Sequence, residues 1–109
     1  MDFSDLGKMK EMMAQASQMQ EQMERRMVET VVEADAGGGM VTARVNGKKE
    51  LLRLKIEKTA LSAAASDGDM EMLEDLITAA VNAAGRKADD AMQSGVAGML
   101  GGLGLPGMS

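Results

Sequence analysis

The sequence of 109 residues has no cysteine, no histidine, no tryptophan and no tyrosine, and its single aromatic residue is Phe3. Without cysteine there is neither a disulfide nor a thiolate metal site. The usual nucleophile and base of covalent catalysis are therefore missing, and no serine has a plausible base near it. The glycines at 37–39 lack the lysine and hydroxyl residue of a phosphate-binding loop. We expect no enzyme activity, no small-molecule substrate, no cofactor and no metal.

Long hydrophobic runs and positive net charge are also lacking. The longest uncharged stretch is at the C-terminus and is rich in glycine, which argues against a membrane span. No apolar segment follows a basic stretch near the N-terminus, so no secretory signal is indicated. We expect a cytoplasmic protein with no membrane partner. The net charge of −5 argues against a polycation that coats nucleic acid, but it is compatible with a local basic surface.

Methionine is abundant, with thirteen residues, and takes the volume that aromatic side chains usually fill. The length suits one domain, which we place at 1–94, followed by a flexible tail rich in glycine and methionine at 95–109. A domain of this size leaves much of its surface in water, so sharing a core with a second copy would help it. The composition therefore favours a homodimer.

Residues 5 to about 27 are expected to form an amphipathic helix. Its apolar stripe recurs in alternating steps of three and four, which is the spacing of one helical face. The stripe consists of Met9, Met12, Ala16, Met19 and Met23. Packing against a core or a partner helix is favoured over a copper(I) thioether site, because nothing else in the chain indicates a soft-metal cage.

Residues 28 to 58 change to the period of strands. Alternation predicts a first strand over 28–35, a reversal at the glycines 37–39, a second strand over 40–45 and a third over 48–58. Asn46-Gly47 between two strands predicts a two-residue hairpin turn with positive φ at both positions.

That turn fixes a register. We expect three cross-strand pairs, Val45 with Lys48, Ala43 with Glu50 and Val41 with Leu52. One face of the sheet would then be apolar, with Val41, Ala43, Leu52, Leu54 and Ile56. The other face would carry Arg44, Lys49, Arg53 and Lys55, together with Met40, Thr42 and Leu51.

Residues 59–68 are interpreted as a connection with room for a helical turn. A second long helix is predicted from near Asp69, which can cap it, to about Ser94-Gly95. Its apolar stripe comprises Leu73, Leu76, Ile77, Ala80, Val81, Ala84 and Ala88. The order of helix, three antiparallel strands and helix predicts an α+β fold.

Two stretches carry a family resemblance, Gly37 to Leu52 and Asp69 to Asn82. Both resemble the YbaB/EbfC family of bacterial nucleoid-associated proteins, as do the Met/Gln-rich start and the C-terminal tail. The resemblance implies an αβββα subunit and a homodimer joined through the strand region, with helices projecting like the arms of tweezers. It also implies association with double-stranded DNA in the nucleoid, with weak or no sequence preference.

Basic residues gather between positions 44 and 58. Six basic residues stand against Glu50 and Glu57 there, a net charge of +4. Such a patch suits backbone phosphates. The alternative interpretation is a solvated sheet face whose charges are balanced across strands by Glu29, Glu33 and Asp35.

The ends of the two long helices are the second candidate site. Basic residues there commonly serve only the helix dipole. Lys87 lies close to the apolar stripe of its helix, which suggests that this part of the stripe has left the core, as in a projecting arm. The candidate DNA contacts are Lys8, Lys10, Arg25, Arg26, Arg44, Lys49, Arg53, Lys55, Arg86 and Lys87. The candidate dimer or core residues are Val41, Ala43, Leu52, Leu54, Ile56, Leu73, Leu76 and Ile77.

These observations predict a homodimer that grips duplex DNA through backbone phosphates with little or no sequence specificity, and that serves chromosome organisation or gene regulation. No zinc finger, recognition helix or stacking aromatic is present to read bases. The alternative is a protein-interaction adaptor that uses the Met-rich first helix, because methionine surfaces adapt to several partners.

Overall fold

The structure, a computed structural model, describes residues 3–101. Its elements are α1 (Phe3–Glu29), β1 (Val31–Ala36), β2 (Val41–Asn46), β3 (Leu51–Ile56), α2 (Lys58–Asp67) and α3 (Met70–Gly101). The strands form one antiparallel sheet in the order β1-β2-β3. The predicted α+β fold is confirmed, and the segment expected to be a connection forms the ten-residue helix α2.

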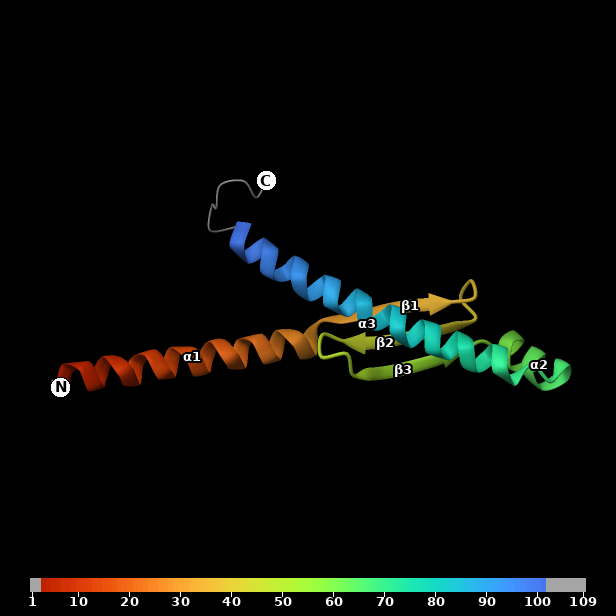
Figure 1. The fold of residues 1–109 in the computed structure, drawn as a ribbon, viewed down its shortest axis with the longest axis horizontal. Coiled ribbons are helices and arrows are strands. Elements are labelled where there is room, and N and C mark those ends of the chain that lie inside the picture. Colours follow the sequence, from red (N-terminus) through yellow and green to blue (C-terminus); the bar gives the residue numbers. More distant parts are fainter. Residues whose placement is uncertain (1–2, 102–109) are drawn as a thin grey trace.

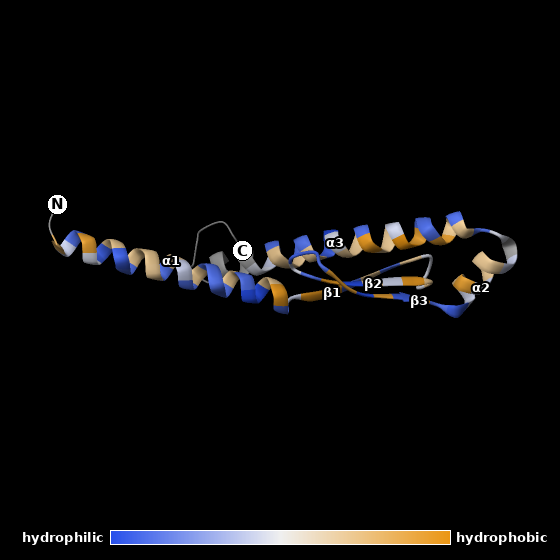
Figure 2. Cartoon of the chain, turned by 90° about the horizontal axis from the view of Figure 1, so that it is seen from below, coloured by the Kyte–Doolittle hydropathy of each residue, from blue (hydrophilic) through white to orange (hydrophobic). Residues whose placement is uncertain are grey.

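Helix α3 covers one face of the sheet, and α2 packs against α3 at the far end (Figure 1). The apolar side of α3 is turned towards the strands, while no helix within residues 3–101 lies over the opposite face of the sheet (Figure 2). Small side chains dominate the core, and the largest ones fully buried are Val41 and Val45. The other buried apolar residues are Ala43, Ala60, Ala64, Leu73, Ala80, Ala84 and Ala88.

The apolar stripe predicted for α3 is confirmed, since its remaining members Leu76, Ile77 and Val81 pack against this core. Asp69 caps the helix as expected, because its Oδ1 accepts a hydrogen bond from the backbone N of Met72 at 3.2 Å. The helix does not end at Ser94-Gly95 but continues to Gly101. Residues 102–109 of the expected tail lie outside the described residues.

Helix α1 projects from the body. None of its 27 residues is buried, and at 1.5 Å per residue it is about 40 Å long. The molecule measures 76 × 33 × 17 Å. Its radius of gyration is 21.4 Å, whereas a compact domain of this length has a value of about 13 Å. The helix extends through Glu29, so the first strand begins at Val31 and not at residue 28 as predicted.

The predicted register of the second hairpin is wrong. Val41 lies opposite Ile56 and Ala43 opposite Leu54, four residues further along β3 than expected. A bulge near Arg44/Val45 then places Val45 opposite Leu51. The shift is an even number of residues, so Leu54 and Ile56 keep the predicted apolar face, whereas Leu52 at the bulge is 51% exposed.

The cause of the shift is a longer turn built around Asn46. The backbone N atoms of Lys48 and Glu50 both donate to Asn46 Oδ1, at 3.0 and 3.1 Å. Asn46 Nδ2 donates to Glu50 Oε1 at 2.8 Å, and the asparagine is only 2% exposed. The positive φ of this turn falls on Lys49, at 64°, and not on Gly47. The two-residue turn expected from Asn46-Gly47 is therefore not formed.

Candidate nucleic-acid interface

The uncovered face of the sheet brings basic residues from β2 and β3 together. Arg44 lies opposite Arg53 across one pair of strands and opposite Glu33 across the other. A shallow hollow of about 290 Å³ lies over these positions. It is lined by Glu33, Thr42, Arg44, Arg53 and Lys55. Like charges directly opposite each other destabilise a sheet, so this face favours an anion over it.

Part of this positive charge is balanced within the chain. Arg44 Nε donates to Glu33 Oε1 at 2.7 Å, so the cross-strand balance considered for Arg44 is present. Lys55 Nζ lies 3.3 Å from Glu57 Oε1. All four side chains are between 44% and 61% exposed, and pairs this exposed contribute at most about 1 kcal/mol. Such pairs can exchange a carboxylate for a phosphate at little cost.

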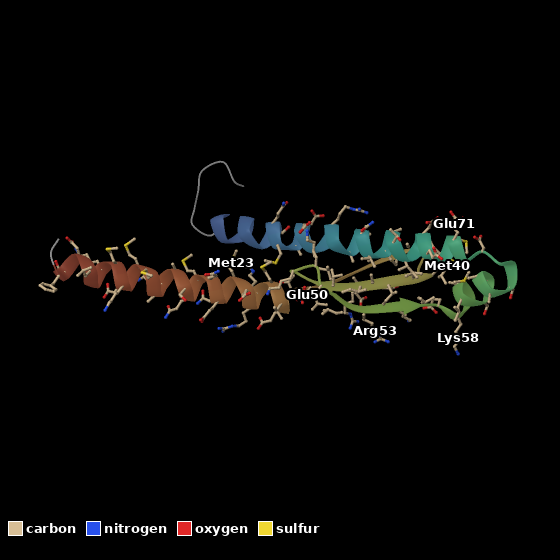
Figure 3. The ribbon with its side chains drawn as sticks, turned by 60° about the horizontal axis from the view of Figure 1, so that its bottom comes forward. Met23, Met40, Glu50, Arg53, Lys58 and Glu71 are labelled. Carbon is tan, nitrogen blue, oxygen red and sulfur yellow. The ribbon has the colours of Figure 1, made fainter. Side chains whose placement is uncertain are left out.

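Arg53 and Lys58 have no ion pair within residues 3–101, unlike the other four basic residues between 44 and 58. Both side chains point away from α3, on the same side of the molecule (Figure 3). With Arg44 and Lys55 they form what we call the basic surface. Lys58 was counted in the basic segment but was not among the predicted contacts.

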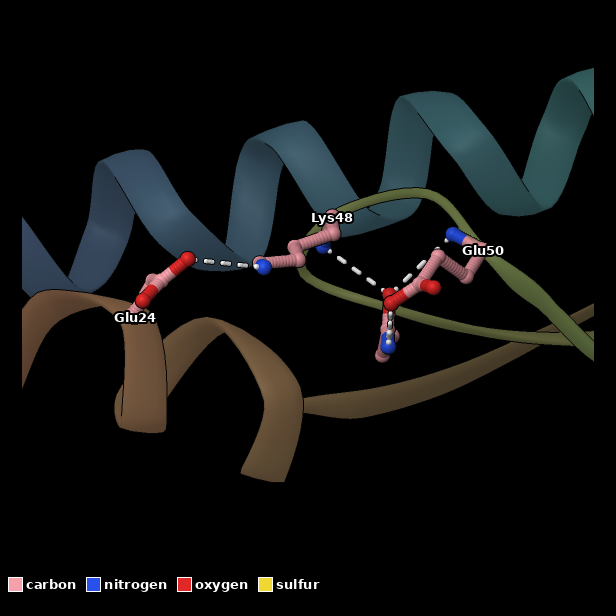
Figure 4. Close-up of polar contacts among 4 residues, drawn as sticks. Glu24, Lys48 and Glu50 are labelled. Carbon is pink, nitrogen blue, oxygen red and sulfur yellow. Dashed lines mark hydrogen bonds and ion pairs between the residues drawn. The ribbon is translucent and has the colours of Figure 1, made fainter.

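The turn between β2 and β3 fastens the base of α1. The backbone N of Gly47 donates to Met27 O at 2.7 Å. Lys48 Nζ donates to Glu24 Oε1 at 3.0 Å, which joins the turn to the preceding turn of α1 (Figure 4). Lys49 Nζ reaches Asp89 Oδ2 of α3 at 3.4 Å. Lys49 is therefore partly balanced, by α3 and not by the acidic residues of β1.

The predicted contacts on α1 are not gathered on one surface. Arg25 lines a mixed-charge hollow with Glu21, Glu24, Val28 and Lys48. The guanidinium group of Arg26 packs against Gly95 of α3, at the place where a Cβ atom would stand. Lys8 and Lys10 are exposed near the free end of the helix. The structure thus separates these four cations from the basic surface.

The interpretation of Lys87 as part of a projecting arm is wrong. Its Nζ donates to the backbone O of Glu33 in β1 at 2.9 Å. Ala84 and Ala88, on either side of it, are 0% exposed, so α3 is still packed on the sheet at this point. Arg86 is exposed beside a cleft that Lys49 and Asp89 also line. We call α1, which has no buried residue, the arm.

Two features are absent from the part of the chain that is described. No group of three or more acidic side chains there is placed to hold a metal ion. No helix within residues 3–101 is both long enough and apolar enough to cross a membrane. The exposed cations of the basic surface have the charge that suits a polyanion.

These features define a small α+β protein with one projecting helix and a basic surface on an uncovered sheet. A sequence profile of the YbaB/EbfC DNA-binding family matches residues 6–103, and the chain belongs to this family. The resemblance seen in the sequence is thereby confirmed. The family is one of DNA-binding proteins and not of enzymes.

Relatives cover almost the whole chain. A nucleoid-associated protein of Acidobacterium capsulatum is 55% identical over 100 residues, which are 91% of this chain and 93% of that protein. One of Koribacter versatilis is 53% identical over 97 residues, 89% of this chain and 92% of the relative. The crystal structure of an uncharacterized protein from Helicobacter pylori matches with a TM-score of 0.63 and 28% identity, covering 92% of this chain and 98% of the other.

Proposed function

We propose that the chain is a nucleoid-associated protein that binds duplex DNA as a homodimer, through backbone phosphates and with little or no sequence preference. It performs no catalysis and resides in the cytoplasm on the nucleoid. The main support for the phosphate contact is the position of Arg53 and Lys58. They have no ion pair within residues 3–101, and both point to the side of the sheet away from α3. The names of the Acidobacterium and Koribacter relatives support the location.

Counterion release is the physical reason why a chain of net charge −5 would bind DNA. Each phosphate that a lysine or arginine neutralises frees a condensed counterion, which lowers the slope of log affinity against log salt by about 0.9. The exposed pairs of Arg44 and Lys55 can open in favour of phosphates. Because the net charge is −5, we expect modest affinity that falls steeply as salt is added.

The homodimer is proposed to form across the free edge of β3. This strand is an edge of the sheet, and Leu51 and Leu52 along it are 49% and 51% exposed. An unpaired edge with apolar side chains is a template for another strand. A two-fold axis there would continue the sheet into the second copy and place two basic surfaces next to each other.

DNA binding is tested with a matched pair of charge reversals. R53E/K58E alters the basic surface, and K8E/K10E alters the free end of α1 by the same net charge. Fluorescence anisotropy with several unrelated duplexes of equal length is followed over a salt titration. We expect similar midpoints for all duplexes, with R53E/K58E losing affinity and salt slope more than K8E/K10E. Equal losses, or a strong preference for one duplex, would contradict the proposal.

The edge contact is tested by L52E, with V31E as the matched control on the opposite edge of the sheet, where Val31 is 50% exposed. Sedimentation equilibrium at micromolar concentration measures the molecular mass. L52E should weaken self-association strongly, because it places a charge beside an apolar edge, and V31E should leave it nearly unchanged. The reverse ranking would move the dimer contact to β1.

A further inference from the structure

Gly95 lies inside α3, at a position where the backbone does not require glycine. Its φ is not among the positive ones of the described residues, and α3 continues beyond it to Gly101. Glycine in the interior of a helix is destabilising relative to alanine. A Cβ atom at this position would lie 3.0 Å from Arg26 Cζ and 3.3 Å from Arg26 Nε, and closer still to Nη2. The missing side chain therefore makes room for a guanidinium group from α1.

The backbone of Arg26 is fixed as well. Its carbonyl O accepts two hydrogen bonds from Thr30, one from the backbone N at 3.0 Å and one from Oγ1 at 2.6 Å. These bonds satisfy the end of α1 just before β1 begins at Val31. Arg26 is half-buried, whereas its neighbour Arg25 is exposed. Arg26 is thus held through its backbone by the segment that leads into β1 and through its side chain by α3.

The next residue attaches the helix to a different element. Met27 O accepts the hydrogen bond from the backbone N of Gly47 at 2.7 Å. Met92 Sδ of α3 lies 2.9 Å from the place of a Cβ atom at Gly47, so three elements meet at this glycine. The base of α1 is therefore fastened to α3 through Arg26 and to the turn between β2 and β3 through Met27 (Figure 4). Two attachments to different elements restrict the swing of a helix more than either one alone.

We infer that Arg26 is a positioning residue for DNA binding: seated on Gly95, it fixes the direction in which the arm leaves the body and does not itself contact phosphate. The arm is about 40 Å long, so a change of about 10° at its base moves its free end by about 7 Å. Lys8 and Lys10 lie near that end. The effect on DNA rests on the proposed function. Cations that already stand in one direction lose less freedom on binding than cations on a swinging arm.

The direction of the arm is measured by double electron–electron resonance. Spin labels are attached at S17C on α1 and A79C on α3, two exposed positions in a chain without cysteine. An excess of unlabelled chain confines the measurement to distances within one chain. G95A and R26K each disturb the contact and keep the net charge, because alanine displaces the guanidinium group and lysine lacks its planar shape. Alanine favours helix more than glycine does, so G95A keeps α3 folded.

We expect both variants to broaden the distance distribution about twofold, because an arm of this length amplifies a swing at its base. The matched control is R25K, the same change at the exposed neighbour, which should keep the distribution of the unaltered chain. A distribution in either G95A or R26K as narrow as that of R25K would overturn the inference.

DNA binding by the same two variants separates a positioning role from a phosphate contact. If Arg26 only contacted a phosphate, R26K would bind as the unaltered chain does, since lysine keeps the charge, and G95A would bind at least as well. We expect instead that both variants lose affinity about threefold in fluorescence anisotropy, because a swinging arm must be ordered on binding. Unchanged affinity in both would overturn the role in DNA binding. If the unaltered chain binds no duplex, the proposed function fails, while the distance distributions still decide whether Arg26 positions the arm.

Discussion

The two long helices repeat apolar residues at the same spacing, yet their surroundings differ completely. Helix α3 buries Leu73 and three alanines against the sheet, while α1 buries nothing. Alanine lets α3 approach the strands closely, which suits a core whose largest fully buried side chains are valines. Methionine on α1 reaches outward and adapts to whatever covers it. Helical periodicity thus identifies a face that needs a partner, and side-chain size indicates how close that partner lies.

The largest effect is expected where α3 meets the sheet. Ala84 is 0% exposed, so A84L forces extra methylene groups into a packed contact and should lower the free energy of unfolding by about 3 kcal/mol. Urea denaturation followed by circular dichroism measures this loss. The control is A14L on the exposed surface of α1, where the same change meets only solvent and should alter stability little. Equal effects at the two positions would mean that α3 is not packed as described.

The next effect lies at the junction between arm and body. A Cβ atom at Gly47 would lie 2.7 Å from Met27 O and 2.9 Å from Met27 Cα, and backbone atoms cannot rotate away. G47A should therefore cost about 2 kcal/mol and loosen the last turn of α1. Amide hydrogen exchange should rise at residues 24–29 more than in the middle of α3. Exchange that stays unchanged at these residues would show that α1 is held in some other way.

The fold was largely predictable because its elements follow local patterns. Alternation located the three strands, and the stripe from Leu73 to Ala88 located α3. The hairpin register failed because Gly47 is not used for its conformational freedom. It is used for its lack of a side chain against Met27, twenty residues earlier in the chain. A contact between distant segments leaves no local signal, so Asn46-Gly47 was interpreted by its usual turn chemistry.

The basic surface was predictable only in part, for a related reason. Arg44, Arg53 and Lys55 alternate along strands, so their common face followed from the period of two. Lys87 was misplaced because its partner, a backbone carbonyl of β1, is 54 positions away. The structure shows that Arg53 and Lys58 have no ion pair within residues 3–101, whereas the neighbouring cations do. Amino-acid composition alone cannot make this distinction. Net charge of a segment predicts a potential site, while the partners of each cation decide which residues are available.

The smallest predicted effect concerns the stability of α1 itself. Gly7 lies within α1 and has no atom near the place of a Cβ, so G7A gains helix propensity without a clash. The gain is about 0.5–1 kcal/mol for an interior helix position. Because α1 is attached only at its base, this gain should slow amide exchange in α1 roughly two- to fivefold in dilute protein while the urea midpoint of the body stays constant. If the midpoint rises by the same free energy, α1 and the body unfold as one unit, and the arm is less independent than its exposure indicates.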